Sequence, residues 1–589
     1  MQVANLHLRN NQQGFTQPAV EPPAGFAKVA RTTRIPRRFS HSSIPTVPIE
    51  PITGSRPIRS IVRGTMLLTA RCHPAALLLA TLAVFAAGST AFGQGGNFDG
   101  FGNLIDAQAT SPTTAAPARS RGQAADPWGP VHTDHLSLAN AAPVLLPFFN
   151  NGPVYGLYGT VLGDFWDRTQ ITGDWGGRRT DLARRGVFFD VYTTSAYQDL
   201  TSGGLYPGGW FVQNTQMCVN VDTGRAGWWD GGLIHFTTQA RYGGNPEQTF
   251  NSGATVPIYT GLLEPGPLNY STTLPSEYFL VQGLSEHTSF LVGKISDVYI
   301  PDQTLFGDSY KFYFANFAFN KNPITTNFYN PTAWAVLGIW APSKQLAFAG
   351  GVLDPNSQAS NLATNAFDKV NLYFTAVASY DIAGLPGQFS PAFNWSNQYQ
   401  IDLENPFGTL APSQIPQAVG VLLGSPNNRG LPINNSTNSC FLIANASQYL
   451  YVADRPRDVK AKLKAGVPLR GIGVFGRAGW APQATNTITG DGSVALFARG
   501  LAESRAYDSV GVGWYLNGIS PDLVNQVRKY TRGAINVQNE QGLEVFYDYA
   551  LTPAFRIIPS YQHIWNPLSA VAAGNTDTDL WMMRGTVVF

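Results

Sequence analysis

Short segments in which apolar and polar residues alternate fill the sequence from Val187 to the C-terminus. They are separated by turns rich in Gly, Pro, Asn and Asp, and clear examples are residues 233–242, 371–381 and 393–400. In the first example, Ile234 and Phe236 fall on one face of an extended chain, while His235 and Gln239 fall on the other. A period of two residues is typical of strands with one apolar and one polar face, so the pattern predicts an all-β chain.

The composition favours a membrane barrel over a soluble sandwich. Only 13% of the residues are charged and 12% are aromatic, whereas a soluble domain carries about 25% charge. No stretch approaches the roughly 20 consecutive apolar residues that a membrane-spanning helix needs. A closed sheet pairs every backbone N–H and C=O group in hydrocarbon, with apolar side chains toward lipid and polar ones toward water. We therefore predict a transmembrane antiparallel β-barrel over residues 187–589, a length that suits about 16 to 18 strands.

The sequence before the strands indicates export. Residues 66–93 have the pattern of a signal peptide, in which Arg71 precedes a long apolar run and small residues follow. A signal peptide functions only at the N-terminus, so we expect translation to start at Met66 and residues 1–65 not to be translated. Residues 94–164 are then a flexible, low-complexity periplasmic lead.

This processing changes the charge of the chain. The net charge is +2, of which residues 1–65 contribute +7 and Arg71 contributes +1, leaving −6 for the exported chain. We therefore expect no nucleic-acid partner.

The sequence predicts no metal, cofactor or catalytic site. Cys218 and Cys440 match no metal-ligand spacing, and the choice between a disulfide and two separate thiols stays open. Residues 471–476, GIGVFG, match G-x-G-x-x-G, but no helix follows, so we interpret them as glycines of a packed strand. The nearest suggestion of a hydrolase is EHTS at 286–289, where nothing places a nucleophile beside His287.

A short capped helix is predicted within residues 165–186, directly before the first strand. Asp174 can accept a hydrogen bond from the first free N–H groups, and Arg184 and Arg185 suit the negative end of the helix dipole. Gly186 then ends the helix.

The last residues, WMMRGTVVF, form another alternating segment, in which Trp581, Met583, Val587 and Phe589 share a face. A terminal strand that ends in Phe resembles the signal by which bacterial outer-membrane proteins are recognised for assembly. We therefore expect Phe589 to be an assembly signal, and the last strand to close the barrel against the first.

Several motifs resemble those of the carbohydrate-selective porin (OprB) family. They are TGDWGGRRTDLARRGVFFDVYTTSAYQ at 172–198, VGKISDVY at 292–299, FANFAF at 314–319, GVFGRAGWAP at 473–482 and IIPSYQHIWNP at 557–567. The resemblance implies a 16-stranded outer-membrane barrel that lets glucose-like sugars diffuse into the periplasm without catalysis.

The arginines of the predicted helix, Arg178, Arg179 and Arg184, have two interpretations. They keep a solvated helix out of the membrane, or the helix folds into or under the barrel mouth and they bias the lumen toward neutral hydroxylated solutes.

Other pore-lining candidates lie on the polar faces of predicted strands. They are Asp222, His235, Gln239, Arg241, Glu544 and Asp548, which are either ordinary lumen polarity or part of a constriction. Trp210 and Phe546 are aromatic candidates for covering the apolar side of a sugar ring, with girdle or packing positions as the alternative.

The expected partners are the outer-membrane bilayer, small carbohydrates and the assembly machinery, and the oligomeric state stays open. Two alternatives to a sugar channel also remain. One is a general diffusion porin, and the other is a barrel that anchors structural or adhesive loops such as residues 406–438.

Overall fold

The computed structural model describes most of the chain after residue 160. The described residues are 161, 164–166, 168–243, 251–256, 272–296, 306, 311–328, 332–343, 345–357, 366–425, 427–456, 458–459 and 469–589. The expectations for residues 1–65 and 66–93, and nearly all of the lead at 94–164, lie outside this part of the chain.

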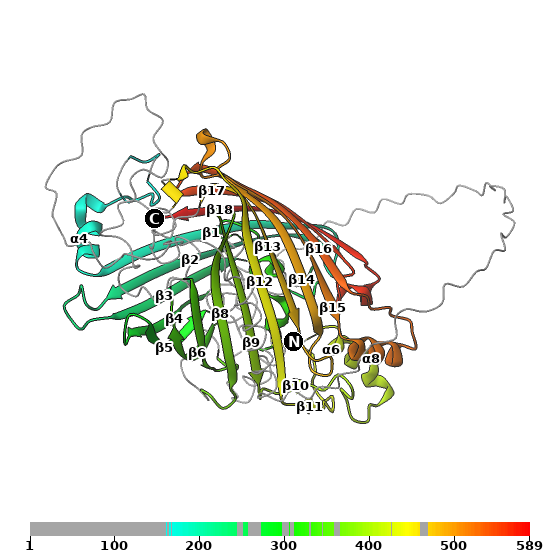
Figure 1. Ribbon diagram of the computed structural model, residues 1–589. Helices are drawn as coiled ribbons and strands as arrows, with labels where there is room; N and C mark the ends of the chain where they lie inside the picture. Colours follow the sequence, from blue (N-terminus) through cyan, green and yellow to red (C-terminus); the bar gives the residue numbers. More distant parts are fainter. Residues whose placement is uncertain are drawn as a thin grey trace, which may run out of the picture.

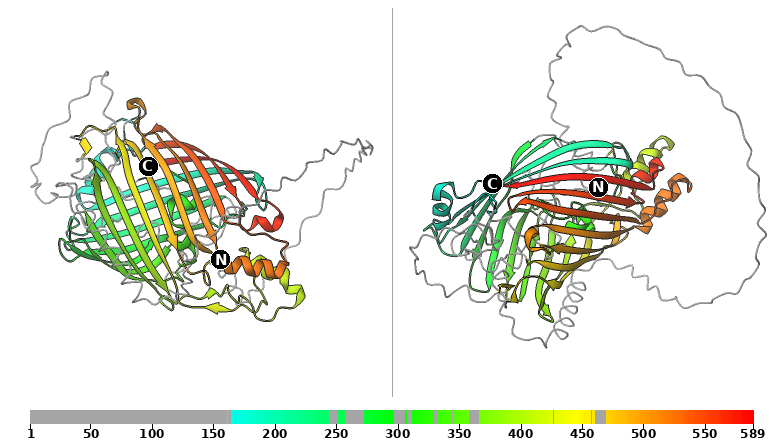
Figure 2. Two further views of the ribbon diagram at one scale, coloured as in Figure 1. Left: turned by 45° about the vertical axis from the view of Figure 1, so that its right-hand side comes forward. Right: turned by 90° about the horizontal axis from the view of Figure 1, so that it is seen from above.

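The described residues form a closed antiparallel barrel of sixteen strands, which confirms the predicted fold (Figure 1). The strands are β1 (Val187–Gly203), β2 (Gly208–Asp222), β3 (Gly232–Gly243), β4 (Thr272–Gly283), β5 (Thr288–Ser296), β6 (Thr332–Trp340), β7 (Leu346–Leu353), β8 (Asn371–Ile382), β9 (Leu385–Ser396), β12 (Ser439–Val452), β13 (Gly471–Trp480), β14 (Ile488–Arg499), β15 (Ser509–Ile519), β16 (Glu540–Thr552), β17 (Phe555–Trp565) and β18 (Asp577–Val588). Strands β10 (Gln400–Ile401) and β11 (Asn435–Ser436) form a separate small sheet between β9 and β12. Figure 2 shows the strands running obliquely around the barrel.

The first and last strands close the barrel, as predicted. Val588 of β18 lies opposite Tyr192 of β1, and the pairing continues to Thr578 opposite Gly203. The backbone N–H of Phe589 also donates to the carbonyl of Val191 at 2.8 Å. The seam is therefore closed by strand pairing, with one irregularity between Leu200 and Ser202.

The two ends of the barrel differ in their connections. Two-residue connections, 383–384 and 553–554, lie at the end that also holds the C-terminus and α4 (Arg178–Arg184). The long connections 397–438 and 520–539 lie at the other end, with α6 (Ile415–Leu422) and α8 (Pro521–Thr531). We call these the turn end and the loop end. Short turns face the periplasm in bacterial outer-membrane barrels, and long loops face the outside.

Alternating burial along the strands separates the two faces. On β3, His235, Gln239 and Arg241 are buried on the inner face, whereas Phe236 and Tyr242 are exposed on the outer face. This agrees with the predicted polar inner face and apolar outer face. No helix among the described residues is long and apolar enough to cross a membrane.

The inner face of the neighbouring strands departs from the simple pattern of polar residues inside. On β6, the inward residues are Ala333, Ala335, Leu337 and Ile339, and all are buried. They belong to a large apolar cluster that also includes inward residues of β4, β5 and β7. Their inner face is apolar because it packs inside the barrel instead of facing water.

At the loop end, the long connections pack together. Leu422 of α6 and Leu523 of α8 are buried in one apolar cluster, together with Phe407 and Leu568. Ser520 caps α8 by accepting a hydrogen bond from the backbone N–H of Leu523. Residues 397–438 therefore form part of a packed cap.

Candidate channel constriction

A chain segment between β5 and β6 folds into the barrel. We call residues 311–328 the inserted segment; it contains α5 (Phe317–Asn320) and the 3₁₀ helix η9 (Pro323–Asn327). Side chains that point inward from β8, β13, β14, β16, β17 and β18 bond to it. Because these strands lie on different sides of the wall, the segment occupies the interior.

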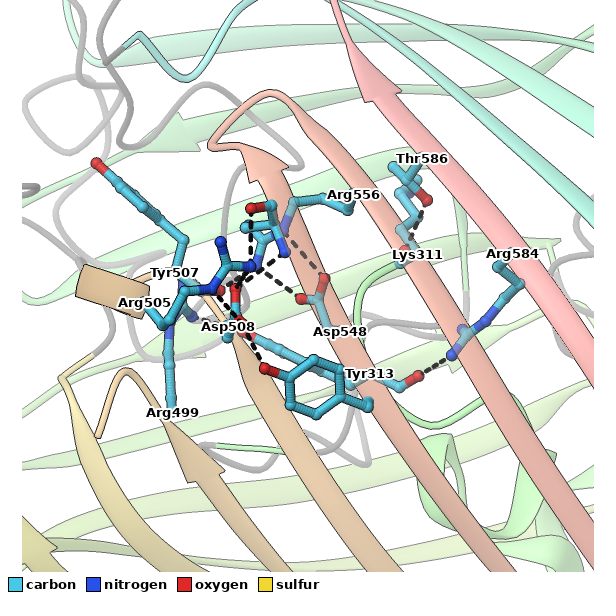
Figure 3. A network of polar contacts seen from close by, with 12 residues as sticks. Lys311, Tyr313, Arg499, Arg505, Tyr507, Asp508, Asp548, Arg556, Arg584 and Thr586 are labelled. Atoms are coloured by element: carbon cyan, nitrogen blue, oxygen red, sulfur yellow. Dashed lines mark hydrogen bonds and ion pairs between the residues drawn. The ribbon is translucent and has the colours of Figure 1, made fainter. Parts of the chain in front are cut away.

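The first part of the inserted segment is bound through its backbone. Glu544 of β16 accepts hydrogen bonds from the N–H groups of Ala315 and Asn316, each at 2.8 Å. On β18, Thr586 donates to the carbonyl of Lys311 at 2.7 Å, and Arg584 donates to the carbonyl of Tyr313 (Figure 3). These bonds hold residues 311–316 against the wall.

The second part is anchored in the same way. Arg477 of β13 donates to the carbonyl of Phe319 at 2.8 Å, and Asn371 of β8 donates to the carbonyl of Phe328 at 2.8 Å. Asp491 of β14 accepts from the N–H of Ile324 at 3.1 Å. These wall residues therefore help to satisfy backbone groups of the segment that are buried inside the barrel.

Inward-facing glycines let the aromatic side chains of the inserted segment approach the wall. A Cβ atom at Gly513 of β15 would lie 2.5 Å from the ring of Phe319, and one at Gly511 would lie 2.7 Å from the ring of Phe314. A Cβ atom at Gly473 of β13 would lie 2.1 Å from the ring of Phe306, which precedes the inserted segment. These distances are below any ordinary carbon–carbon contact. The glycines of GIGVFG thus lie in a packed strand, as predicted.

A network of charged and phenolic groups surrounds the start of the inserted segment (Figure 3). Arg556 of β17 forms a bidentate pair with Asp548 of β16, with N–O distances of 2.6 and 3.1 Å. Arg505 pairs with Asp508 at 2.7 Å in the connection between β14 and β15. Burial lowers the pKa of Arg505, but the hydrogen bond and charge of Asp508 outweigh it and raise the pKa overall. Each of the two arginines thus lies beside a carboxylate of its own.

The polar candidates on β2 and β3 lie on the inner wall at another place. Asn214 donates to Gln239 at 2.8 Å, and the ring of His235 bonds to Asn220 at 2.7 Å. Asp222 pairs with Arg225, which lies just beyond the end of β2, at 3.3 Å. Arg241 is buried on the same inner face of β3.

The aromatic candidates on the inner wall are both buried. Trp210 of β2 packs in an apolar cluster with Leu200 and Leu580. Phe546 of β16 packs edge-on against Phe314 of the inserted segment, with ring centroids 4.7 Å apart. Phe546 is therefore part of the wall that contacts the inserted segment.

The three arginines of the helix segment lie at the turn end. Arg179 is buried and donates to the main-chain oxygen of Phe589 at 3.0 Å, to the carbonyl of Phe189 at 2.6 Å and to Asp190 at 3.1 Å. Arg184 is exposed and pairs with Asp181 of its own helix, and Arg178 is also exposed. The structure thus brings Arg179 to the barrel seam and none of the three to the inserted segment.

Local geometry explains why the chain forms this turn-end structure. Asp174 accepts hydrogen bonds from the N–H and hydroxyl of Thr180, each at 2.8 Å, while Gly176 and Gly177 adopt positive φ angles. The N–H of Ile171 donates to the carbonyl of Val588 at 2.8 Å. The motif TGDWGGRR therefore builds a clamp over the last residues of β18.

Two further sequence candidates, His287 and Cys218, lie on the wall and its turns. His287 lies in the β4–β5 turn, where its ring bonds to the carbonyl of Ala341 at 3.0 Å. Cys218 is a buried free thiol that accepts a hydrogen bond from Thr237, so it is not paired with Cys440. Within the described ranges, no group of three or more His, Cys, Asp or Glu side chains is arranged to hold a metal ion.

Sequence reasoning named Glu544 but missed four arginines around the inserted segment. Arg477, Arg499, Arg556 and Arg584 all lie on inner faces, and strand alternation gave the signal for each of them. Alternation predicts that these side chains point inward, but it does not predict that a chain segment lies inside the barrel beside them.

Comparison with known proteins supports the same architecture. The family model of the carbohydrate-selective porin, OprB family, matches residues 212–579, which is more than half of the chain. The motifs at 292–299, 314–319, 473–482 and 557–567 lie inside this range, whereas most of the motif at 172–198 precedes it. No curated protein sequence matches the chain.

Solved structures resemble the barrel at low sequence identity. A high-pH structure of Pseudomonas putida OprB is 17% identical with a TM-score of 0.57, and covers 72% of this chain and 100% of that chain. A low-pH structure of the same protein is 13% identical with a TM-score of 0.43, and covers 72% of this chain and 99% of that one. The first of these supports the fold. Together with the family model, it shows that this chain belongs to the OprB family of carbohydrate-selective porins.

Proposed function

We propose that the protein is a passive channel through which glucose-like carbohydrates diffuse across the outer membrane into the periplasm. The family and the sixteen-stranded barrel place the protein in the outer membrane, which its strands cross repeatedly. The observation that carries the proposal is the inserted segment. A barrel of sixteen strands leaves a wide aqueous lumen, and a segment folded inside it narrows that lumen.

The wall around the constriction has the chemistry that suits a neutral, hydroxylated solute. Its charges are largely paired, as in Asp548 with Arg556, so the wall offers hydrogen-bond donors and acceptors beside aromatic rings. Sites for small polar molecules commonly combine these features. We propose that the inward residues of β2, β3 and β16 named above line the path: Asp222, His235, Gln239, Arg241, Glu544 and Asp548.

We propose that the channel performs no catalysis. His287, the histidine of the nearest hydrolase-like motif, bonds to a backbone carbonyl in an exposed turn. A nucleophilic triad needs a base within hydrogen-bond reach of its nucleophile and a third group that orients the base.

The adhesive alternative rested on residues 406–438, which are rich in Gly and Asn. The loop-end cap argues against it, because α6 packs on α8 and Ser569 donates to the carbonyl of Leu423. A loop that is packed on both sides is suited to shape the entrance of the channel, whereas an adhesin would need an extended, accessible loop.

Liposome swelling tests this function. Liposomes that contain the purified protein should swell faster in glucose than in an amino acid of similar size. Equal rates in both solutes would reduce the protein to a general diffusion porin, and no swelling in either would contradict a channel.

A further inference from the structure

We propose that Tyr313 contacts the sugar ring at the turn-end exit of the constriction and contributes to sugar selectivity. The proposal rests on the proposed function and names a residue that performs it. The structure describes every residue of the inserted segment, and only Tyr313 and Thr326 keep part of their surface exposed. All the other residues of the segment are buried against the wall or one another. A solute can therefore touch the segment at few side chains, and Tyr313 is the aromatic one.

The position of Tyr313 along the barrel follows from its anchors. Arg499, which bonds to its hydroxyl, is the last residue of β14 at the turn end. Thr586 binds the nearby carbonyl of Lys311 and lies three residues from the C-terminus. Ile324, by contrast, bonds to Asp491 near the loop-end start of β14. Tyr313 thus lies on the periplasmic side of the inserted segment.

Three contacts fix the Tyr313 ring before any ligand arrives. Arg499 Nη1 donates to the phenolic oxygen at 2.8 Å, and Arg584 donates to the backbone carbonyl of the same residue (Figure 3). The ring packs edge-to-face against Phe497, with centroids 5.0 Å apart and planes at 85°. Because the ring is already ordered, binding a solute costs little further side-chain entropy.

The pair of Tyr313 and Arg499 has the chemistry to recognise a hexopyranose. The carbon–hydrogen face of such a sugar is apolar and can stack on an aromatic ring, while its edge carries hydroxyl groups. The guanidinium beside the ring is planar, permanently charged and rich in donors. A small neutral amino acid such as serine has no comparable apolar face, so the ring would favour the sugar over it.

The experiment compares glucose and serine permeation through single-residue variants in liposomes. Tyr313→Leu and Tyr313→Met both remove the ring and retain an apolar side chain, so that either can serve if the other assembles poorly. Tyr561→Leu is the matched control, because Tyr561 lies on the outer face of β17 and its hydroxyl bonds to Asp579 at 2.6 Å. Heat-dependent gel mobility confirms that each variant has formed a barrel.

We expect the glucose-to-serine permeation ratio to fall about two- to tenfold in the Tyr313 variants, the range of a single aromatic contact. Ion conductance should be unchanged or higher, and the control should keep the ratio of the unaltered protein. A folded Tyr313 variant that keeps this ratio would overturn the proposal while leaving the sugar channel intact. If the unaltered protein itself shows no preference for glucose, the proposed function fails, and the role of Tyr313 fails with it.

Discussion

Arg179→Ala should destabilise the assembled barrel strongly, although the residue lies in a short helix outside the strands. The side chain is buried and links three parts of the chain: the oxygen of Phe589 on the last strand, the carbonyl of Phe189 on the first, and the Asp190 carboxylate. The variant removes all three hydrogen bonds and leaves the carboxylate buried without its cation.

The magnitude follows from burial. Removing one partner of a buried ion pair costs about 3–5 kcal/mol, because the remaining charge loses its compensation. Arg184→Ala provides the matched control on the same helix, since its ion pair with Asp181 is exposed. An exposed pair contributes at most about 1 kcal/mol. The double variant Arg179→Met with Asp190→Leu should recover part of the loss, because it removes both charges.

Unfolding in urea, followed by the gel mobility of unboiled samples, measures the difference. We expect the midpoint for Arg179→Ala to lie well below that for Arg184→Ala, and the glucose permeation of the assembled variant to be unchanged. Equal midpoints for the two variants would refute the clamp at the seam. A lower midpoint together with altered sugar selectivity would indicate instead that Arg179 lines the pore.

Four further outcomes are expected. Glu544→Leu leaves two buried backbone N–H groups without an acceptor, at a cost of about 1–3 kcal/mol each. The inserted segment should then be held less firmly, so single channels should show larger and noisier conductance. A quiet channel of unaltered conductance would contradict the role of Glu544 as an anchor. Gly513→Val should displace Phe319 from the wall and lower the amount of assembled protein. A normal amount of assembled protein would show that the wall can accommodate the larger side chain. Deleting Phe589 should lower the amount of protein in the outer membrane and leave the conductance of each assembled channel unchanged; the reverse result would contradict its role as an assembly signal. Mass spectrometry of outer membranes should find a chain that begins near Gln94, and peptides from residues 1–65 would refute the start at Met66.

The strands could be predicted from the sequence because alternation is a local property. His235, Gln239 and Arg241 point inward because they occupy alternate positions on one strand, and no distant residue changes that parity. The closing seam was also predictable, since a sheet in a membrane cannot leave an edge.

The inserted segment could not be predicted, because its stability depends on partners far away in the sequence. Phe314 and Phe319 lack a strict period and are buried against Gly511 and Gly513, almost 200 residues later. In the sequence those glycines look like turn signals. The role of Arg179 at the seam was hidden for the same reason, since one of its partners is the last residue of the chain.

Single-channel recording in a planar bilayer tests the central claim most directly. The account predicts stepwise openings from the purified protein, and a current that falls in a saturable way as glucose is added, because a sugar that occupies the constriction excludes ions. Serine at equal concentrations should change the current far less. The absence of stepwise conductance, or a current that responds equally to both solutes, would contradict a sugar-selective constriction formed by residues 311–328.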